Sequence, residues 1–396
     1  MGSTMEDPRE PGARTPEQPP RSTGRREFLR LGGLGALALG LSQAGEAAEP
    51  FLVRSSRPQD LEPSPADLDA DFTPNDVFFV RSHFGPPSMR IKEGWALRLD
   101  GLVAGPVALS LAALDRLPQY ELPAVLQCSG NGRAFVRPPV PGAQWARGAV
   151  GQALWKGPRL RDVLAHAGLR PGARYVHLLG FDLPPMLTTP RFLRSIPLER
   201  AMHETTLVAT RMNGEPLPHL HGGPARLVVP GWAGDHWVKW LREITVARDD
   251  APGFYMQVAY RMPRGPVQPG QKIDPADETP VQELLVKSLF TRPTAGARLG
   301  AGVPVEIRGV AFAGMQGVQR VELSIDGSPW FDARLAPPGS LGSWQRFRAP
   351  WTPAVGRHTL RVRATDSRGV MQPEVSGWNP GGYLWNGIDV IEVAVS

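Results

Sequence analysis

Alternation of apolar and polar residues near the C-terminus constrains the fold of this chain more than any other feature. Residues 303–307, 321–325 and 360–364 each place an aliphatic side chain at every second position. A period of two is typical of a β-strand with one buried face. Asp326-Gly327 follows the second segment and is a strong signal for a hairpin turn. Short strands with turn signals and no helical pattern predict a β-sandwich over residues 283–396.

The preceding part of the chain mixes both patterns. Strands are predicted at residues 76–80, 95–101, 124–126, 175–179, 226–231 and 244–246, and helices at 111–117, 160–167 and 198–202. Ser110, Gly168 and Pro197 supply the helix start and stop signals. Glycine (44) and proline (43) are abundant, which favours short strands and long connections. We predict an α+β architecture in which a mixed α/β domain spans residues 49–262, with a linker at 263–282.

The only cysteine, Cys128, follows the apolar segment 124–126 and precedes a Ser-Gly-Asn-Gly turn and Arg133. Backbone amides and a cation beside a thiol favour its thiolate form, which is both a nucleophile and a metal ligand. Lone cysteines are more often packed as small apolar residues, but a glycine-rich loop is an unusual place for such a residue. One cysteine excludes an intramolecular disulfide framework, Cys-x-x-Cys-His haem attachment and iron–sulfur ligation.

The N-terminus has the pattern of an export signal. Residues 1–23 are polar and without periodicity, which predicts disorder. Arg25-Arg26 then precedes an apolar run at residues 31–41 and small residues beyond it. The run of 11 residues is too short for a stable membrane span. The order of basic, apolar and small residues predicts export by the twin-arginine route and a periplasmic location, with residues 1–48 as signal and disordered leader. A basic tail beside a short helix is the alternative.

The net charge of the chain and its distribution along the sequence indicate which kinds of partner it can bind. The formal net charge is +6, and no run of lysine or arginine follows the signal. We therefore expect no nucleic-acid binding, since neither a basic stripe nor a binding motif is present. A modest basic excess fits anionic small substrates or an acidic protein partner.

Several polar residues cluster at predicted strand ends and turns, where functional sites tend to lie. They are Arg81, His83, Cys128, Arg133, Asp182, His221, Arg226, Lys239 and Tyr260. Each histidine or lysine taken alone is usually structural or solvent-facing. Together they would supply one thiolate and several cations to a polyanionic ligand. One thiolate is too few for a closed zinc site, but it suffices for a metal that brings sulfur ligands on an organic cofactor.

The chain resembles the sulfite oxidase family of molybdenum enzymes over nearly its whole length after the signal. The resembling motifs lie at residues 78–83, 126–133, 148–155, 212–218, 221–226, 228–231 and 238–241, in this order. The resemblance implies a molybdopterin-binding domain followed by an immunoglobulin-like dimerisation domain, and a molybdenum-molybdopterin cofactor.

Residue roles follow from the resemblance position by position. Cys128 would be the protein ligand to molybdenum. Arg81 and Arg133 would line the anion pocket, and Tyr260 would hydrogen-bond near the metal, which makes these four the implied catalytic residues. The implied cofactor-binding residues are Phe79, Val80, Arg81, Ser82, His83, Cys128, Asp182, His221, Arg226, Trp237, Val238 and Lys239.

The resemblance also implies a reaction and partners. It implies oxidation of sulfite, or of a sulfane sulfur on a carrier protein, by oxygen-atom transfer. Without a preceding haem domain, electrons would pass to a separate c-type cytochrome. The protein would form a homodimer or a complex with a cytochrome subunit.

One stretch departs from the family pattern. The eukaryotic enzymes carry an arginine in a Trp-Asn-x-Arg motif, whereas Gly381 takes that place here, after Trp378-Asn379. The substitution favours a sulfur substrate larger than free sulfite, as in bacterial sulfane dehydrogenases. Two alternatives stay open: a molybdenum-dependent sulfoxide-type reductase and a non-enzymatic exported binding protein.

Overall fold

The computed structural model describes residues 51–396. The export signal predicted for residues 1–48 lies outside the described residues. Within the described part, no helix is long and apolar enough to cross a membrane.

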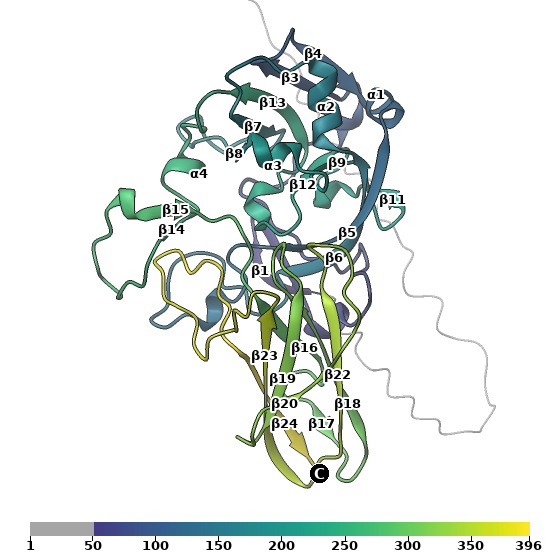
Figure 1. Ribbon diagram of the computed structural model, residues 1–396, viewed down its shortest axis with the longest axis vertical. Helices are drawn as coiled ribbons and strands as arrows, with labels where there is room; N and C mark the ends of the chain where they lie inside the picture. Colours follow the sequence, from purple (N-terminus) through teal and green to yellow (C-terminus); the bar gives the residue numbers. More distant parts are fainter. Residues whose placement is uncertain (1–50) are drawn as a thin grey trace, which may run out of the picture. The chain divides into compact units, whose positions relative to one another are not determined.

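The first half of the described chain is built on small sheets with short helices (Figure 1). A hairpin of β1 (Phe51–Ser56) and β2 (Gln59–Pro63) comes first. One sheet has the order β4 (Val107–Ser110), β3 (Ala96–Gly101), β13 (Leu241–Ala247), β7 (Tyr175–Gly180) and β8 (Leu193–Pro197). Another has the order β11 (Glu215–Pro216), β10 (Arg211–Met212), β6 (Val150–Pro158) and β5 (Gln119–Gln127). Strands β12 (Arg226–Val228) and β9 (Leu207–Ala209) pair separately.

The helices are α1 (Leu111–Arg116), α2 (Leu160–Ala167), α3 (Leu198–Met202) and α4 (Phe254–Gln257). The Ser110 hydroxyl accepts a hydrogen bond from the Ala113 amide at 3.2 Å, which caps α1 as predicted. Helix α2 buries its apolar face, and Gly168 ends it with φ +70°. The three longer helices therefore begin and end within one residue of their predicted bounds.

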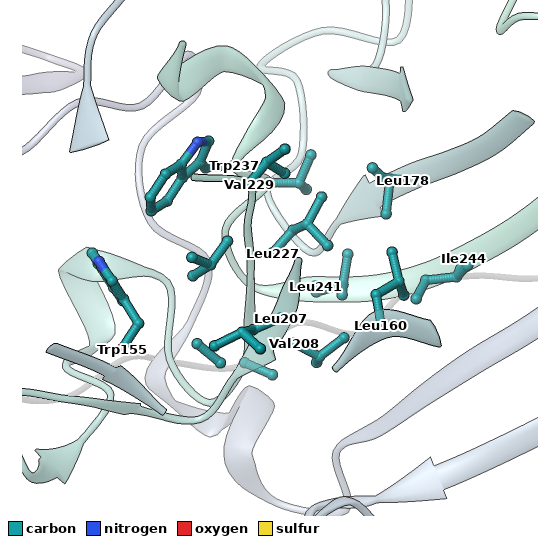
Figure 2. Close-up of a cluster of buried hydrophobic side chains, with 14 of the residues drawn as sticks. Trp155, Leu160, Leu178, Leu207, Val208, Leu227, Val229, Trp237, Leu241 and Ile244 are labelled. Carbon is teal, nitrogen blue, oxygen red and sulfur yellow. The ribbon is translucent and has the colours of Figure 1, made fainter. Parts of the chain in front are cut away.

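The main core of this half is a continuous apolar cluster. Its members include residues of β6, β7, β9, β12, β13 and α2, and Figure 2 shows ten of the cluster labelled. The rings of Trp155 and Trp237 meet edge to face, with centroids 5.7 Å apart. Because Trp237 is held in this core, the chain on either side of it is held in place as well.

The strand predicted at residues 76–80 is wrong. The segment forms turns, and only Val80 bridges to Leu61. Phe78 and Phe79 are consecutive and both buried, with ring centroids 5.4 Å apart. A half-exposed strand would bury only one of two neighbouring residues, so the apolar run here reflects burial on all sides.

The second half forms the predicted β-sandwich. One sheet has the order β16 (Lys287–Arg292), β18 (Val305–Phe312), β22 (Gln345–Trp351) and β21 (Arg334–Leu335). The other has the order β17 (Arg298–Leu299), β24 (Asp389–Val395), β23 (Gly356–Asp366), β19 (Val318–Ile325) and β20 (Phe331–Asp332). Asp326 and Gly327 both have positive φ, +52° and +75°, as the predicted hairpin turn requires.

The two halves share buried contacts. An apolar cluster joins Val125 and Val150 to Val310, Phe312 and Leu384. Strand β15 (Glu278–Pro280) lies in the stretch predicted as a linker and pairs with β14 (Arg261–Pro263), which ends where that stretch begins. The domain limits at residues 48, 262 and 282 stay predictions.

Candidate active site

A cavity lies at the strand ends of the first half, with Cys128 in its wall. Cys128 directly follows β5, Asp182 follows β7, and Arg226 begins β12. Of the predicted site residues, the cavity wall includes Phe79, Arg81, Ser82, His83, Cys128, Asp182, His221, Arg226, Trp237, Val238, Lys239 and Tyr260. Segments up to 181 residues apart in sequence thus meet at one place, as the resemblance implied.

The loop after Cys128 is held by a network of hydrogen bonds. The Cys128 amide donates to the Ala149 carbonyl at 2.9 Å. The Asn131 side chain donates to Gln127 Oε1 at 3.2 Å and accepts from the Ala149 amide at 3.2 Å. Lys287, on β16, donates from Nζ to the Asn131 carbonyl at 3.3 Å. These bonds hold the backbone that carries Cys128 in place.

Burial opposes the thiolate form that the sequence around Cys128 predicts. Burial raises the pKa of Cys128, while Arg81, Arg133 and the Gly130 amide lower it less strongly. Desolvation disfavours the charged form of a thiol. A bound metal cation would supply the missing charge, because thiolates are deprotonated on coordination.

Two buried cations face the cavity without a full complement of acids. Arg226 donates to the backbone carbonyls of His221 (2.8 Å) and Trp237 (3.0 Å), and its buried Nε has no partner among the described residues. Burial lowers the pKa of Arg226 to about 9. Burial and the neighbouring Arg226 lower the pKa of Lys239 to about 7, whereas Asp182 raises it. A buried cation without a counterion is costly, so this end of the cavity suits an anionic group.

Arg81 is the third cation of the cavity. Its Nη1 contacts both carboxylate oxygens of Asp60, at 3.1 and 3.3 Å, and donates to the Ser82 carbonyl at 2.7 Å. Burial raises the pKa of Asp60, although Arg81 lowers it. No hydrogen bond within residues 51–396 engages Nε or Nη2 of Arg81, so this part of the guanidinium can serve a ligand.

Tyr260 and His83 form a polar pair on another wall. The hydroxyl of Tyr260 lies 2.6 Å from Nε2 of His83. The Tyr260 ring stacks on that of Tyr383, and its backbone has φ +56°, a left-handed conformation. Burial raises the pKa of Tyr260, so its hydroxyl keeps its proton at neutral pH. Burial, helped by Arg81 and Arg194, lowers the pKa of His83 to about 3.

Two predicted site residues do not line the cavity. Arg133 donates from Nε to the Gly381 carbonyl and from Nη1 to the Ala143 carbonyl, both at 3.0 Å. Its side chain therefore braces the loop after Cys128 rather than facing a substrate. Val80 is buried in the bridge to Leu61. These two placements differ from the roles that the resemblance implied.

A buried charged group beside the cavity is absent from the predicted set. Arg194, on β8, donates from Nη2 to Asp235 Oδ2 at 2.5 Å and lies 3.0 Å from Nε2 of His236. Asp235 lines the cavity, and the Arg194 guanidinium lies 5.2 Å from the centroid of the Tyr260 ring. Burial raises the pKa of Asp235 to about 7, although Arg194 lowers it. The Gly-Asp-His sequence before Trp237 could have suggested Asp235, but nothing in the sequence points to Arg194 as its partner.

His83 and His221 should each make the folded protein less stable as acid is added, because both are buried and neutral in it. Burial lowers the pKa of His221 to about 4 and that of His83 to about 3. Unfolded histidines bind protons near pH 6.5, so between about pH 6.5 and 4 these two positions hold more protons in the unfolded chain than in the folded one. We expect each of the two to lower the unfolding free energy by up to about 1.4 kcal/mol per pH unit in that range, while Asp235, whose pKa burial raises to about 7, contributes in the opposite direction.

Urea unfolding between about pH 4.5 and 7 tests this expectation. A His83→Gln, His221→Gln variant should show a flatter acid slope. His358→Gln is the control, because Asp326 raises the pKa of His358 and its contribution is lost as pH rises instead. An acid slope unchanged in the double variant would contradict the assignment.

Comparisons with known proteins agree with this geometry. The descriptions "Oxidoreductase molybdopterin binding domain" and "Mo-co oxidoreductase dimerisation domain" match residues 83–255 and 278–394. The sulfite oxidase of Gallus gallus is 37% identical over 351 residues, which cover 84% of this chain and 75% of that protein. The mitochondrial sulfite oxidase of Homo sapiens is 34% identical, covering 87% of this chain and 66% of that protein. The solved sulfane dehydrogenase SoxCD from Paracoccus pantotrophus aligns with a TM-score of 0.74 and 25% identity, covering 90% of this chain and 92% of that one.

Proposed function

The chain belongs to the sulfite oxidase family of molybdopterin oxidoreductases, and on this premise we propose that it oxidises a reduced sulfur substrate, either sulfite or a sulfane sulfur held on a carrier. The main support for the proposal is that one cavity is lined by a thiol, Cys128, and by three cationic side chains. These are Arg81, Arg226 and Lys239. Guanidinium groups suit oxyanions because their planar fork donates two parallel hydrogen bonds.

Molybdenum-molybdopterin is the cofactor of this family, and the residues at the cavity fit it. No three histidine, cysteine or acidic side chains converge on a metal site within residues 51–396, so a metal here needs ligands beyond Cys128. The dithiolene of the pterin would supply them. Arg226, with its unpartnered Nε, and Lys239 would hold the anionic phosphate end. When bound, the cofactor exchanges an oxygen atom and two electrons with the substrate.

The chain itself binds and orients the reactants. Cys128 would hold the metal, on a loop that the Asn131 hydrogen bonds keep in place. Arg81 offers Nε and Nη2 to a substrate oxyanion while Asp60 holds its Nη1. Tyr260 and His83 share one hydrogen between Oη and Nε2, so the Tyr260 hydroxyl is oriented at the cavity wall.

Export and the electron acceptor are parts of the same proposal. The twin-arginine pattern at residues 25–26 supports a periplasmic location. A cytochrome of that compartment would then accept the electrons, and the dimerisation domain description at residues 278–394 supports a dimer.

One experiment tests the activity. The protein purified with its cofactor is analysed for molybdenum and then mixed with oxidised cytochrome c and either sulfite or thiosulfate. We expect molybdenum near one atom per chain and cytochrome reduction that depends on a sulfur substrate. Molybdenum without sulfur-dependent reduction, but with reduction of a sulfoxide by an electron donor, would replace the proposal with the reductase. Absence of molybdenum would overturn both.

Arg81 should control substrate affinity. A charge-assisted hydrogen bond to an oxyanion contributes roughly 1.5–3 kcal/mol, so Arg81→Gln should raise the KM for sulfite about ten- to a hundred-fold. Steady-state kinetics measure the change. Asp60→Asn is the matched control, because it breaks the same ion pair but keeps the cation, and it should change KM much less. Equal effects of both variants would show that the ion pair, not the contact with substrate, matters.

A further inference from the structure

A row of arginines crosses one sheet of the sandwich. In the strand register, Arg292 of β16 lies opposite Arg308 of β18, Arg308 opposite Arg348 of β22, and Arg348 opposite Arg334 of β21. Directly opposite residues share a face of the sheet. Four neighbouring strands therefore place four guanidinium groups side by side, at the strand spacing of about 4.8 Å.

The carboxylates around this row are too few to neutralise it. Arg346, on β22, adds a fifth arginine on the same face. Asp69 pairs with Arg292 (3.3 Å), Arg308 (2.8 Å) and Arg346 (3.6 Å), while Glu306 lies 3.1 Å from Arg308 and 3.9 Å from Arg348. Asp71 pairs only with Arg346, at 3.1 Å. Five cations thus meet three acids.

Arg334 and Arg348 carry the excess charge. No carboxylate of residues 51–396 pairs with Arg334, and Arg348 has only the contact at 3.9 Å, with 53% of its side chain exposed. Like charges directly opposite each other destabilise a sheet. An arrangement that costs stability and remains open to solvent indicates binding rather than folding.

The row lies in a hollow of the surface. A groove is lined by four of the five arginines, with Asp71, Glu306, Phe347 and residues 335–337 at and after the end of β21. A row across four strands is about 14 Å long at that spacing, longer than one small oxyanion can span. Carboxylates in succession along an extended peptide match both the length and the fork geometry of arginine.

We propose that this groove, formed by Arg308, Arg334, Arg346 and Arg348, docks an acidic segment of a partner protein. The arginines of this groove belong to the sandwich, and the groove shares no lining residue with the Cys128 cavity. It does not depend on the chemistry of that cavity. Five arginines against three carboxylates leave a net charge of about +2 on this face.

Binding of a labelled poly-L-glutamate to the full-length protein tests the proposal by fluorescence anisotropy. Two exposed ion-pair contributions are removed by Arg334→Gln with Arg348→Gln, which should weaken binding about five- to twenty-fold. Binding should also weaken between about 50 and 300 mM salt. The matched control is Arg98→Gln with Arg174→Gln, since Arg98 is 53% and Arg174 65% exposed and each has one acidic partner.

Three outcomes would overturn the proposal. The first is an equal loss of binding in the control variant. The second is displacement of the peptide by inorganic sulfate at equal charge concentration, which would identify a small-anion site. The third is a change from dimer to monomer in the Arg334→Gln, Arg348→Gln variant by light scattering, which would make this face a contact between copies of the chain.

Discussion

Replacing Cys128 with serine should reduce turnover by at least about a thousand-fold, which corresponds to roughly 4 kcal/mol of lost transition-state stabilisation. The hydroxyl of serine is a harder ligand than a thiolate and does not ionise near neutral pH, so the metal loses its protein ligand. The backbone network around Asn131 does not use the thiol, and the fold should therefore survive.

Three measurements separate this effect from unfolding. The melting temperature should stay within a few degrees of that of the unmodified protein, since serine and cysteine have similar volumes. Pterin content should fall much less than activity, because Arg226 and Lys239 would still hold the other end of the cofactor. The change also removes the only thiol, so a thiol titration verifies the substitution. Full activity in Cys128→Ser would refute the metal-ligand role.

Breaking the buried pair of Arg194 and Asp235 should produce the largest loss of stability. Both side chains are almost fully buried, with 0% and 1% of their side-chain surface exposed. Arg194→Met leaves the Asp235 carboxyl without its cation, and such losses cost about 3–5 kcal/mol. For a chain of this size we expect the melting temperature to fall by about 10 °C.

A double variant supplies the control. Arg194→Met with Asp235→Leu removes both charges and replaces them with apolar side chains of similar volume, which is often neutral or stabilising for a buried pair. The double variant should therefore be markedly more stable than Arg194→Met alone. Thermal unfolding of the four proteins in this cycle measures the coupling. A coupling near zero would show that the two charges act independently.

Local patterns in the sequence determined much of the fold. The period of two near the C-terminus predicted the sandwich, because alternation follows from the pleat of a single strand. Ser110 and Gly168 marked helix ends, because capping involves only the nearest backbone groups. Asp326-Gly327 predicted its turn for the same reason. Family resemblance along the chain then indicated which strand ends share a site, and all but two of the predicted residues line the cavity.

Tertiary packing decided the properties that depend on distant residues. The segment at residues 76–80 is apolar because the protein buries both of its neighbouring phenylalanines, Phe78 and Phe79. An apolar run in the sequence does not distinguish such burial from a strand with one buried face. Burial raised the pKa of Cys128 against its flanking charges, since desolvation depends on what covers the thiol. Arg133 is held by the carbonyl of Gly381, 248 residues away. The sequence therefore identified Arg133 as a cation near Cys128, and the fold decided that its side chain contacts backbone carbonyls.

Tertiary structure also decided which charged residues meet where no sequence motif predicts the contact. Arg194 and Asp235 are 41 residues apart and meet only because β8 packs against the turn before Trp237. The arginine row exists only in the register of β16, β18, β22 and β21, since a shift by one residue would move each arginine to the other face. The sequence by itself determined which elements form and which chemistry they carry, because propensity, capping and alternation act over a few residues. Register, burial and long-range pairing arise only when those elements pack, and they decided which charges act together.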